Sequence, residues 1–206
     1  MDTPDLNEPE QVLLFLSGAV RSVRDGLDHG ISLADQKMSD LDWDDLLWAH
    51  LVRHGARTYL GSLTPSDDWE LGRELKNSGI EIVRSPIVFR TLKAQAGEPP
   101  HPGHSDARRG FWSQQLSLGL VLNGVEFPAG GANLILDWTV GPKREIRLAL
   151  SKPKGIWVYH GSPKLEWRRS VIVQEGQPLR FEPAEEDVLV EPRFDLTELE
   201  GDGEVG

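Results

Sequence analysis

The sequence predicts an α+β fold in which a helical N-terminal layer packs on a mainly antiparallel β-sheet built of hairpins. Apolar residues follow helical spacing up to about residue 79 and alternate with polar residues after it. The helical segments come first and the strands follow as a block, whereas an α/β protein would alternate them. We therefore expect a helical region at residues 1–79, a β-rich region at 80–190 and a disordered acidic tail at 191–206.

The first and third predicted helices are bounded by typical start and stop residues. Pro9 suits the opening turn of a helix and Asn7 suits its cap. The apolar residues that follow keep helical spacing as far as Gly30, which we expect to end this helix. A third, shorter helix is predicted to begin at 66–67 and to end at Gly79.

The second predicted helix has its charges arranged along its length. It is predicted to begin at Ser39, with Asp42 three residues later in the position of a capping box. Aspartates fill its first turns, and Arg53, His54 and Arg57 are placed in its last turns, as the helix macrodipole favours. One interpretation of these basic residues is therefore a helix C-terminus.

Strand signals begin at residue 80. β-Branched and aromatic residues around Ser85-Pro86 predict two short strands separated by a break. The run 95–110 is rich in Pro and Gly and is predicted to be a loop, one that is long for a passive connection. Asn123-Gly124 is the dipeptide most typical of a type I′ turn and predicts a hairpin. The expected strands are 80–82, 87–89, 116–122, 125–127, 134–140, 146–150, 156–159, 170–174 and 179–181.

Composition limits the class of protein. The 206 residues are 38% hydrophobic, which is enough for a core, and include no cysteine, which excludes disulfides, thiolate nucleophiles and cysteine-based zinc sites. The apolar run 12–16 is too short to span a bilayer and follows acidic residues, so we expect no signal peptide, no membrane association and a cytoplasmic location. An excess of Arg over Lys with abundant Gly and Pro is typical of a GC-rich bacterium.

Charge is segregated along the chain. Residues 1–83 have a net charge of −9, residues 84–169 of +7 and residues 170–206 of −9, within a total of −11. Such asymmetry bears on partners rather than on fold. Cations mixed with aromatic residues on a sheet suit a phosphate backbone and unstacked bases, and they are also typical of a solvated sheet face. The residues expected to contact nucleic acid or another anionic partner are Arg147, Lys152, Lys154, Arg168 and Arg169.

The segment 51–58 contains Arg53-His54-Gly55 followed by Arg57. It resembles the RHG signature of the histidine phosphatases, and the segment around His160 resembles the place of that family's second histidine. The resemblance implies a phosphohydrolase in which His54 is the nucleophile, Arg53 and Arg57 clamp the phosphate and His160 also contacts it. It covers only residues 51–58 and 159–162, and the helix C-terminus is the alternative interpretation.

The predicted loop also contains His101, His104 and Asp106, whose side chains are of types that bind metal ions. No second segment completes a site, so we expect neither a metal nor a cofactor. We expect a non-enzymatic binding or assembly protein of a bacterium or its mobile elements, which selects a protein partner through its segregated charges. The first alternative is a nucleic-acid-binding protein that uses the sheet, and the second is a histidine-phosphatase-like phosphohydrolase. The oligomeric state stays open.

Overall fold

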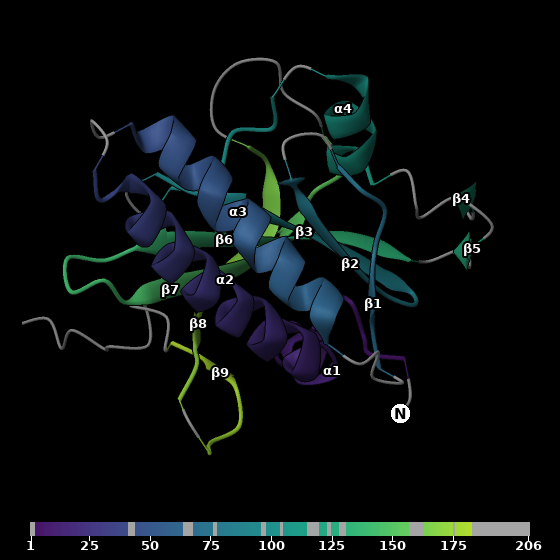
Figure 1. Ribbon diagram of the computed structural model, residues 1–206. Coiled ribbons are helices and arrows are strands. Elements are labelled where there is room, and N and C mark those ends of the chain that lie inside the picture. Colours follow the sequence, from purple (N-terminus) through teal and green to yellow (C-terminus); the bar gives the residue numbers. More distant parts are fainter. Residues whose placement is uncertain are drawn as a thin grey trace, which may run out of the picture.

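The computed structural model has an α+β architecture in which helices α1 to α3 lie along one face of a seven-stranded sheet (Figure 1). The predicted fold class is confirmed. Among the described residues, none of the helices combines the length and the apolar composition that a bilayer span requires. The described residues are 3–40, 44–63, 68–75, 78–95, 98–103, 105–114, 120–122, 125–127, 131–156, 163–174 and 176–182.

Helices α1 (Pro9–Phe15) and α2 (Ser17–Met38) form the first part of the helical layer. The start of α1 at the predicted proline is confirmed, although Glu8 rather than Asn7 occupies the N-cap position. The end predicted at Gly30 is wrong, because α2 continues through it. Gly30 is buried where α2 meets the next helix, and its missing side chain lets the two backbones approach each other.

Helix α3 (Asp45–Ser62) begins later than predicted and extends past Arg57, where the last turn was expected. Ser39 follows the end of α2 and does not open α3, and Asp42 lies outside the described residues. Asp44 is the cap. Its carboxylate accepts hydrogen bonds from two backbone N–H groups of the first turn, at 2.8 and 2.9 Å, and so satisfies donors that have no partner within the helix.

The third predicted helix is wrong. Residues 68–75 contain instead the short strand β1 (Glu70–Leu71), which pairs antiparallel with β2 (Ile80–Arg84) at the edge of the sheet. Pairing with an available strand edge satisfies the backbone groups that a short helix would have satisfied internally, so tertiary context overrides the local helical pattern.

The main sheet has the strand order β1-β2-β3-β6-β7-β8-β9, and β3 and β6 are its parallel neighbours. The other neighbouring pairs are antiparallel, so two meanders are joined by one parallel pair. Strands β4 and β5 form a separate hairpin. The remaining strands are β3 (Ile87–Lys93), β4 (Leu120–Leu122), β5 (Val125–Phe127), β6 (Ala132–Val140), β7 (Ile146–Pro153), β8 (Leu165–Ile172) and β9 (Arg180–Phe181).

The predicted turns have mixed outcomes. The break at Ser85-Pro86 separates β2 from β3 as predicted. In the β4 and β5 hairpin Leu122 lies opposite Val125, which is the register that a two-residue turn requires, while Asn123-Gly124 itself lies outside the described residues. Ile156 is not part of a strand, and the rest of the predicted strand 156–159 lies outside the described residues.

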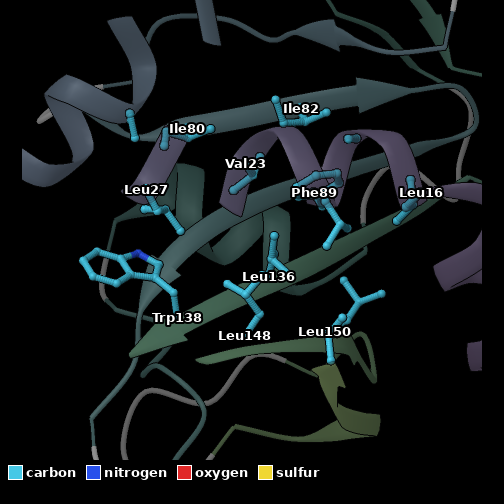
Figure 2. Packing of buried hydrophobic residues seen from close by; sticks show 14 of the residues in the cluster. Leu16, Val23, Leu27, Ile80, Ile82, Phe89, Leu136, Trp138, Leu148 and Leu150 are labelled. Atoms are coloured by element: carbon cyan, nitrogen blue, oxygen red, sulfur yellow. The ribbon is translucent and has the colours of Figure 1, made fainter. Parts of the chain in front are cut away.

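The main core lies between the helical layer and one face of the sheet. Figure 2 shows side chains of α2 packed against side chains of the central strands. Alternation along each strand brings every second residue to this face. The buried residues labelled there are Leu16, Val23, Leu27, Ile80, Ile82, Phe89, Leu136, Trp138, Leu148 and Leu150.

A smaller core lies on the opposite face, under helix α4 (Asp106–Trp112). Phe111 and Trp112 of α4 pack against Val88 and Ile135, which alternate with the residues of the main core. The loop prediction for 95–110 is therefore wrong in its last part. The hydroxyl of Ser105 caps α4 by accepting a hydrogen bond from a backbone N–H of the first turn at 3.3 Å.

Candidate functional site

A cavity of about 600 Å³ lies beside α3, the end of β3 and the segment 98–103 that leads to α4. Three cationic lining residues come from these elements: Arg53 from α3, Lys93 from the last position of β3 and Arg108 from α4. We call this cavity the arginine pocket. Its volume is in the range of cavities that enclose small organic ligands.

Arg53 lies half-buried in the middle of α3. Its Nη2 is 3.0 Å from Nδ1 of His50, one turn earlier, whereas its Nε is buried with no hydrogen-bond partner among the described residues. Burial lowers the pKa of the Arg53 guanidinium, and the positive charge of Arg108 lowers it further. Both effects disfavour the charged form, so the pocket contains a cation whose charge is poorly compensated.

Arg108 lies in the first turn of α4 and packs against Gly103. The backbone of Gly103 has φ +73°, and a Cβ atom there would lie 2.8 Å from Cδ of Arg108. Glycine therefore permits the turn and leaves room for the arginine side chain. Nδ1 of His101, another lining residue, accepts a hydrogen bond from the N–H of Gly103 at 3.1 Å and stabilises this turn.

The far end of α4 is anchored to β6. Nδ2 of Asn133 donates a hydrogen bond to the carbonyl oxygen of Phe111 at 2.9 Å. Gln114, which follows the helix, donates to the Asn133 carbonyl at 2.6 Å and accepts from the Asn133 N–H at 2.8 Å. Asn133 is buried, so these bonds are shielded from water. They hold α4, and with it the backbone of Arg108, in position beside the sheet.

Arg90 of β3 and Glu81 of β2 form a buried ion pair. Nε of Arg90 is 2.9 Å from Oε2 of Glu81, and its guanidinium lies 4.2 Å from the ring centre of Phe111. Burial lowers the pKa of Arg90, Glu81 raises it, and the charges of Arg73 and Arg108 lower it. Oε1 of Glu81 also lies 3.4 Å from Nε of Arg73, so this carboxylate forms ion pairs with two arginines.

In the described part of the chain, the cations of the pocket have no carboxylate in contact with them. Among the described residues, no carboxylate lies within ion-pair distance of Arg53, Lys93 or Arg108. Nζ of Lys93 lies 5.1 Å from the ring centre of Trp48, and Glu98 lines the pocket as an exposed residue. Guanidinium groups bind phosphate and carboxylate through paired hydrogen bonds, so the pocket suits an anionic group.

The residues of the RHG resemblance have separate environments. Arg53-His54-Gly55 lies inside α3 and not at the end of a strand, and His54 is exposed. Arg57 donates hydrogen bonds to the carbonyl oxygens of Gly72 and Gly79, at 3.3 and 3.2 Å, and so connects α3 to the chain around β1. His160 lies outside the described residues. Of the residues in this set that the structure describes, Arg53 alone lines the arginine pocket.

The histidines considered as metal ligands are only partly described. His101 lines the arginine pocket, Asp106 opens α4, and His104 lies outside the described residues. Within the described ranges, no three His, Asp or Glu side chains gather where they could hold a metal ion.

Two of the cations predicted to contact an anionic partner pair with carboxylates nearby. Arg147 is exposed, and its Nε and Nη2 lie 3.0 and 2.5 Å from Oε1 of Glu145. The Lys152 side chain is only 11% exposed, with Nζ 2.7 Å from Oε2 of Glu166 and 3.1 Å from Oδ1 of Asn7. Both charges are therefore compensated within the protein.

The other three predicted cations do not form a common surface. Arg168 donates two hydrogen bonds to Asp137, Nε to Oδ2 at 3.1 Å and Nη2 to Oδ1 at 2.8 Å. Burial raises the pKa of the Asp137 carboxyl, and the hydrogen bonds and charge of Arg168 oppose this. Arg169 is half-buried on the opposite face of β8, because adjacent strand residues alternate, and Lys154 is exposed after β7. The structure does not gather the five predicted cations into one patch.

Lys93 and Arg108 are candidate residues that the sequence does not single out. Lys93 precedes the 95–110 run, and Arg108 lies near the end of that run. Only folding brings their elements, β3 and α4, together. The length of that run is the one signal that pointed to this region, since connections of this length often carry function.

Comparison of the chain with protein-family models, with curated proteins and with solved structures finds no match.

Proposed function

We propose that the protein is a non-enzymatic binding protein that holds a small anionic ligand in the arginine pocket. The observation that carries this proposal is the state of Arg53, a half-buried guanidinium near Arg108 whose Nε has no hydrogen-bond partner among the described residues. A buried donor without a partner costs roughly 1–3 kcal/mol, and a like charge nearby adds to that cost. An anion bound to both guanidinium groups would offset both terms.

The charge of the whole chain favours a small anion over a long polyanion. A net charge of −11 repels a molecule such as nucleic acid over its whole length, whereas a small anion responds mainly to the local field of the pocket. Arg147, Lys152 and Arg168 each already contact a carboxylate, which weakens their attraction for a phosphate backbone. Both points support an anionic small molecule as the ligand.

Arg53→Met is expected to raise the free energy of unfolding of the ligand-free protein by about 1 kcal/mol. The substitution removes the unpartnered Nε and the charge that faces Arg108, and these gains are expected to exceed the loss of the hydrogen bond between Arg53 and His50. Methionine keeps most of the apolar contact of the arginine stem. Urea unfolding in a chloride buffer that contains no phosphate or sulfate measures this change.

Arg57→Met is the matched control, because both arginines are half-buried in α3. It removes the hydrogen bonds to the carbonyl oxygens of Gly72 and Gly79, which is expected to cost about 2 kcal/mol. Equal losses of stability in the two variants would mean that Arg53 is an ordinary structural arginine, contrary to the proposal.

Binding of an anion is expected to raise the Tm of the wild-type protein. Phosphate, sulfate, acetate and phenyl phosphate are titrated against chloride at constant ionic strength, and a ligand at about 100 times its Kd stabilises by about 2.7 kcal/mol. Arg53→Met and Arg108→Gln are expected to reduce the rise strongly, because each weakens binding of the anion. Lys154→Met, which removes an exposed cation that does not line the pocket, is expected to keep it. An equal rise in every variant, or no rise in the wild type with any of these anions, would overturn the proposal.

A further inference from the structure

Apolar residues share the lining of the arginine pocket with its cations. Leu92, Pro99, Pro100 and Pro163 line the same cavity, and all four are half-buried. Proline carries no backbone N–H, so three of these positions present hydrocarbon and offer no backbone donor. An inorganic anion, which is strongly hydrated, gains nothing from contact with such a surface.

The arginine pocket is also larger than an inorganic anion requires. Its volume is about 600 Å³. A phosphate ion occupies roughly the space of two or three water molecules, on the order of 60–90 Å³. Pockets that bind organic ligands usually measure several hundred Å³, and in them the apolar part of the ligand contacts hydrophobic residues while a few polar groups set its orientation. The mixture of cationic and apolar lining residues fits that description.

We infer that the ligand of the arginine pocket is a small organic anion, in which one phosphate or carboxylate group is joined to an apolar ring or chain. This inference rests on the proposed function and names its class of ligand. Arg53 and Arg108 bind the anionic group, because two planar guanidinium groups can hold its oxygens in pairs. The apolar part contacts Leu92 and the prolines. Lys93 adds positive charge, and Glu98 disfavours a second anionic group on the apolar part.

Isothermal titration calorimetry with three probes separates the two parts of such a ligand. Phenyl phosphate carries both parts, inorganic phosphate carries the anionic group and phenol carries the ring. Phenyl phosphate is expected to bind at least about tenfold more tightly than phosphate, because burial of the ring adds to the charge contacts, and phenol is expected not to bind measurably. Equal affinities of phenyl phosphate and phosphate would overturn the inference and leave the proposed function standing. Absence of binding by every oxyanion would overturn both.

Substitutions test whether the cationic lining residues bind the anionic group of the ligand and whether the apolar lining residues bind its apolar part. Arg108→Gln is expected to weaken phosphate and phenyl phosphate alike. Pro163→Ser and Pro100→Ser, each made separately, are expected to bring the ratio of the two affinities toward one while phosphate affinity is retained. Lys154→Met is expected to change neither affinity. A ratio that stays at its wild-type value in both folded proline variants would overturn the inference.

A competition experiment distinguishes a small ligand from a macromolecular one. A single-stranded oligothymidylate is added to the complex with phenyl phosphate. It is expected not to displace the small molecule, because the chain is acidic overall. Displacement with tighter binding than phenyl phosphate would assign the pocket to nucleic acid and overturn the inference.

Discussion

Gly30→Ala is expected to lower the free energy of unfolding by about 3 kcal/mol. Helices α2 and α3 meet backbone to backbone, and a Cβ atom on Gly55 would lie 2.8 Å from Cα of Gly30. A Cβ atom on Gly30 would overlap the carbonyl oxygen of Val52 and lie 3.0 Å from the nitrogen of Ala56. Backbone atoms of a helix cannot rotate aside as a side chain can, so the added methyl group forces the two helices apart.

Gly18→Ala is the matched control in the same helix. Apart from the adjacent backbone of its own helix, a Cβ atom on Gly18 would have no neighbour within 4 Å, so alanine adds helix propensity without a clash and is expected to stabilise by about 0.5 kcal/mol. Urea unfolding followed by circular dichroism compares both variants with the wild type. A gain of stability in both variants would contradict the close contact of α2 and α3.

The fold class is predictable from sequence because it depends on local patterning. The alternation at 134–140 and 146–150 arises because each segment buries one face, and β6 and β7 occupy these positions. The break at Ser85-Pro86 is also local, since proline cannot donate a ladder hydrogen bond. Neither signal depends on which segment lies next to the strand.

Helix boundaries are less predictable because they depend on distant partners. Glycine is typical of helix ends and also of places where two helices pack closely. Gly30 is at a close helix contact because α3 packs against it, and the sequence around Gly30 does not reveal this. Strand β1 forms because the edge of β2 is available for pairing. The sequence of residues 68–75 alone does not indicate that this edge is nearby. Helix α4 is stabilised by burial of Phe111 against the sheet, which overrides the signals of a run rich in Pro and Gly.

The arginine pocket could not be assembled from the sequence. Arg53, Lys93 and Arg108 belong to three elements that are separated along the chain, and no local pattern groups the three residues. The RHG resemblance selects Arg53 together with Arg57, but Arg57 contacts backbone carbonyls and only Arg53 lines the cavity. Convergence of charge is a property of the folded chain.

For the predicted basic surface, local patterning determines the face of the sheet on which a residue lies, but not the residue with which it pairs. Arg168 and Arg169 are adjacent in β8, so period-two alternation alone assigns them to opposite faces. The carboxylate that pairs with Arg168 comes from Asp137 of β6, with β7 between the two strands, and no local pattern reveals it.

Arg168→Met is expected to lower the free energy of unfolding by about 3–5 kcal/mol near neutral pH. The Asp137 side chain is only 3% exposed and that of Arg168 is 25% exposed, so the substitution leaves a buried carboxylate without its cation. Removing one partner of a buried pair costs more than the pair contributes, because the remaining charge has neither its partner nor water.

This loss is expected to shrink as the pH falls. Burial raises the pKa of Asp137 and Arg168 opposes it, so the pKa rises further in the variant. A carboxyl whose pKa is higher in the folded than in the unfolded state takes up a proton on folding. The variant therefore regains stability as the pH falls through the folded-state pKa of Asp137. Urea unfolding of the variant and the wild type at a series of values between about pH 8 and about pH 5 measures the difference.

Two further variants separate the charge of Asp137 from other effects of the substitution. Arg169→Met, at the neighbouring position, is expected to stay within about 0.5 kcal/mol of the wild type and to show no added pH dependence, since the described residues hold no ion pair for Arg169. Asp137→Asn in the Arg168→Met background removes the unpaired charge and is expected to recover much of the loss. If Arg168→Met instead costs less than about 1 kcal/mol at every pH, the pair is not structural. A role for Arg168 in contacting the phosphates of a nucleic acid would then gain support over the small-anion proposal.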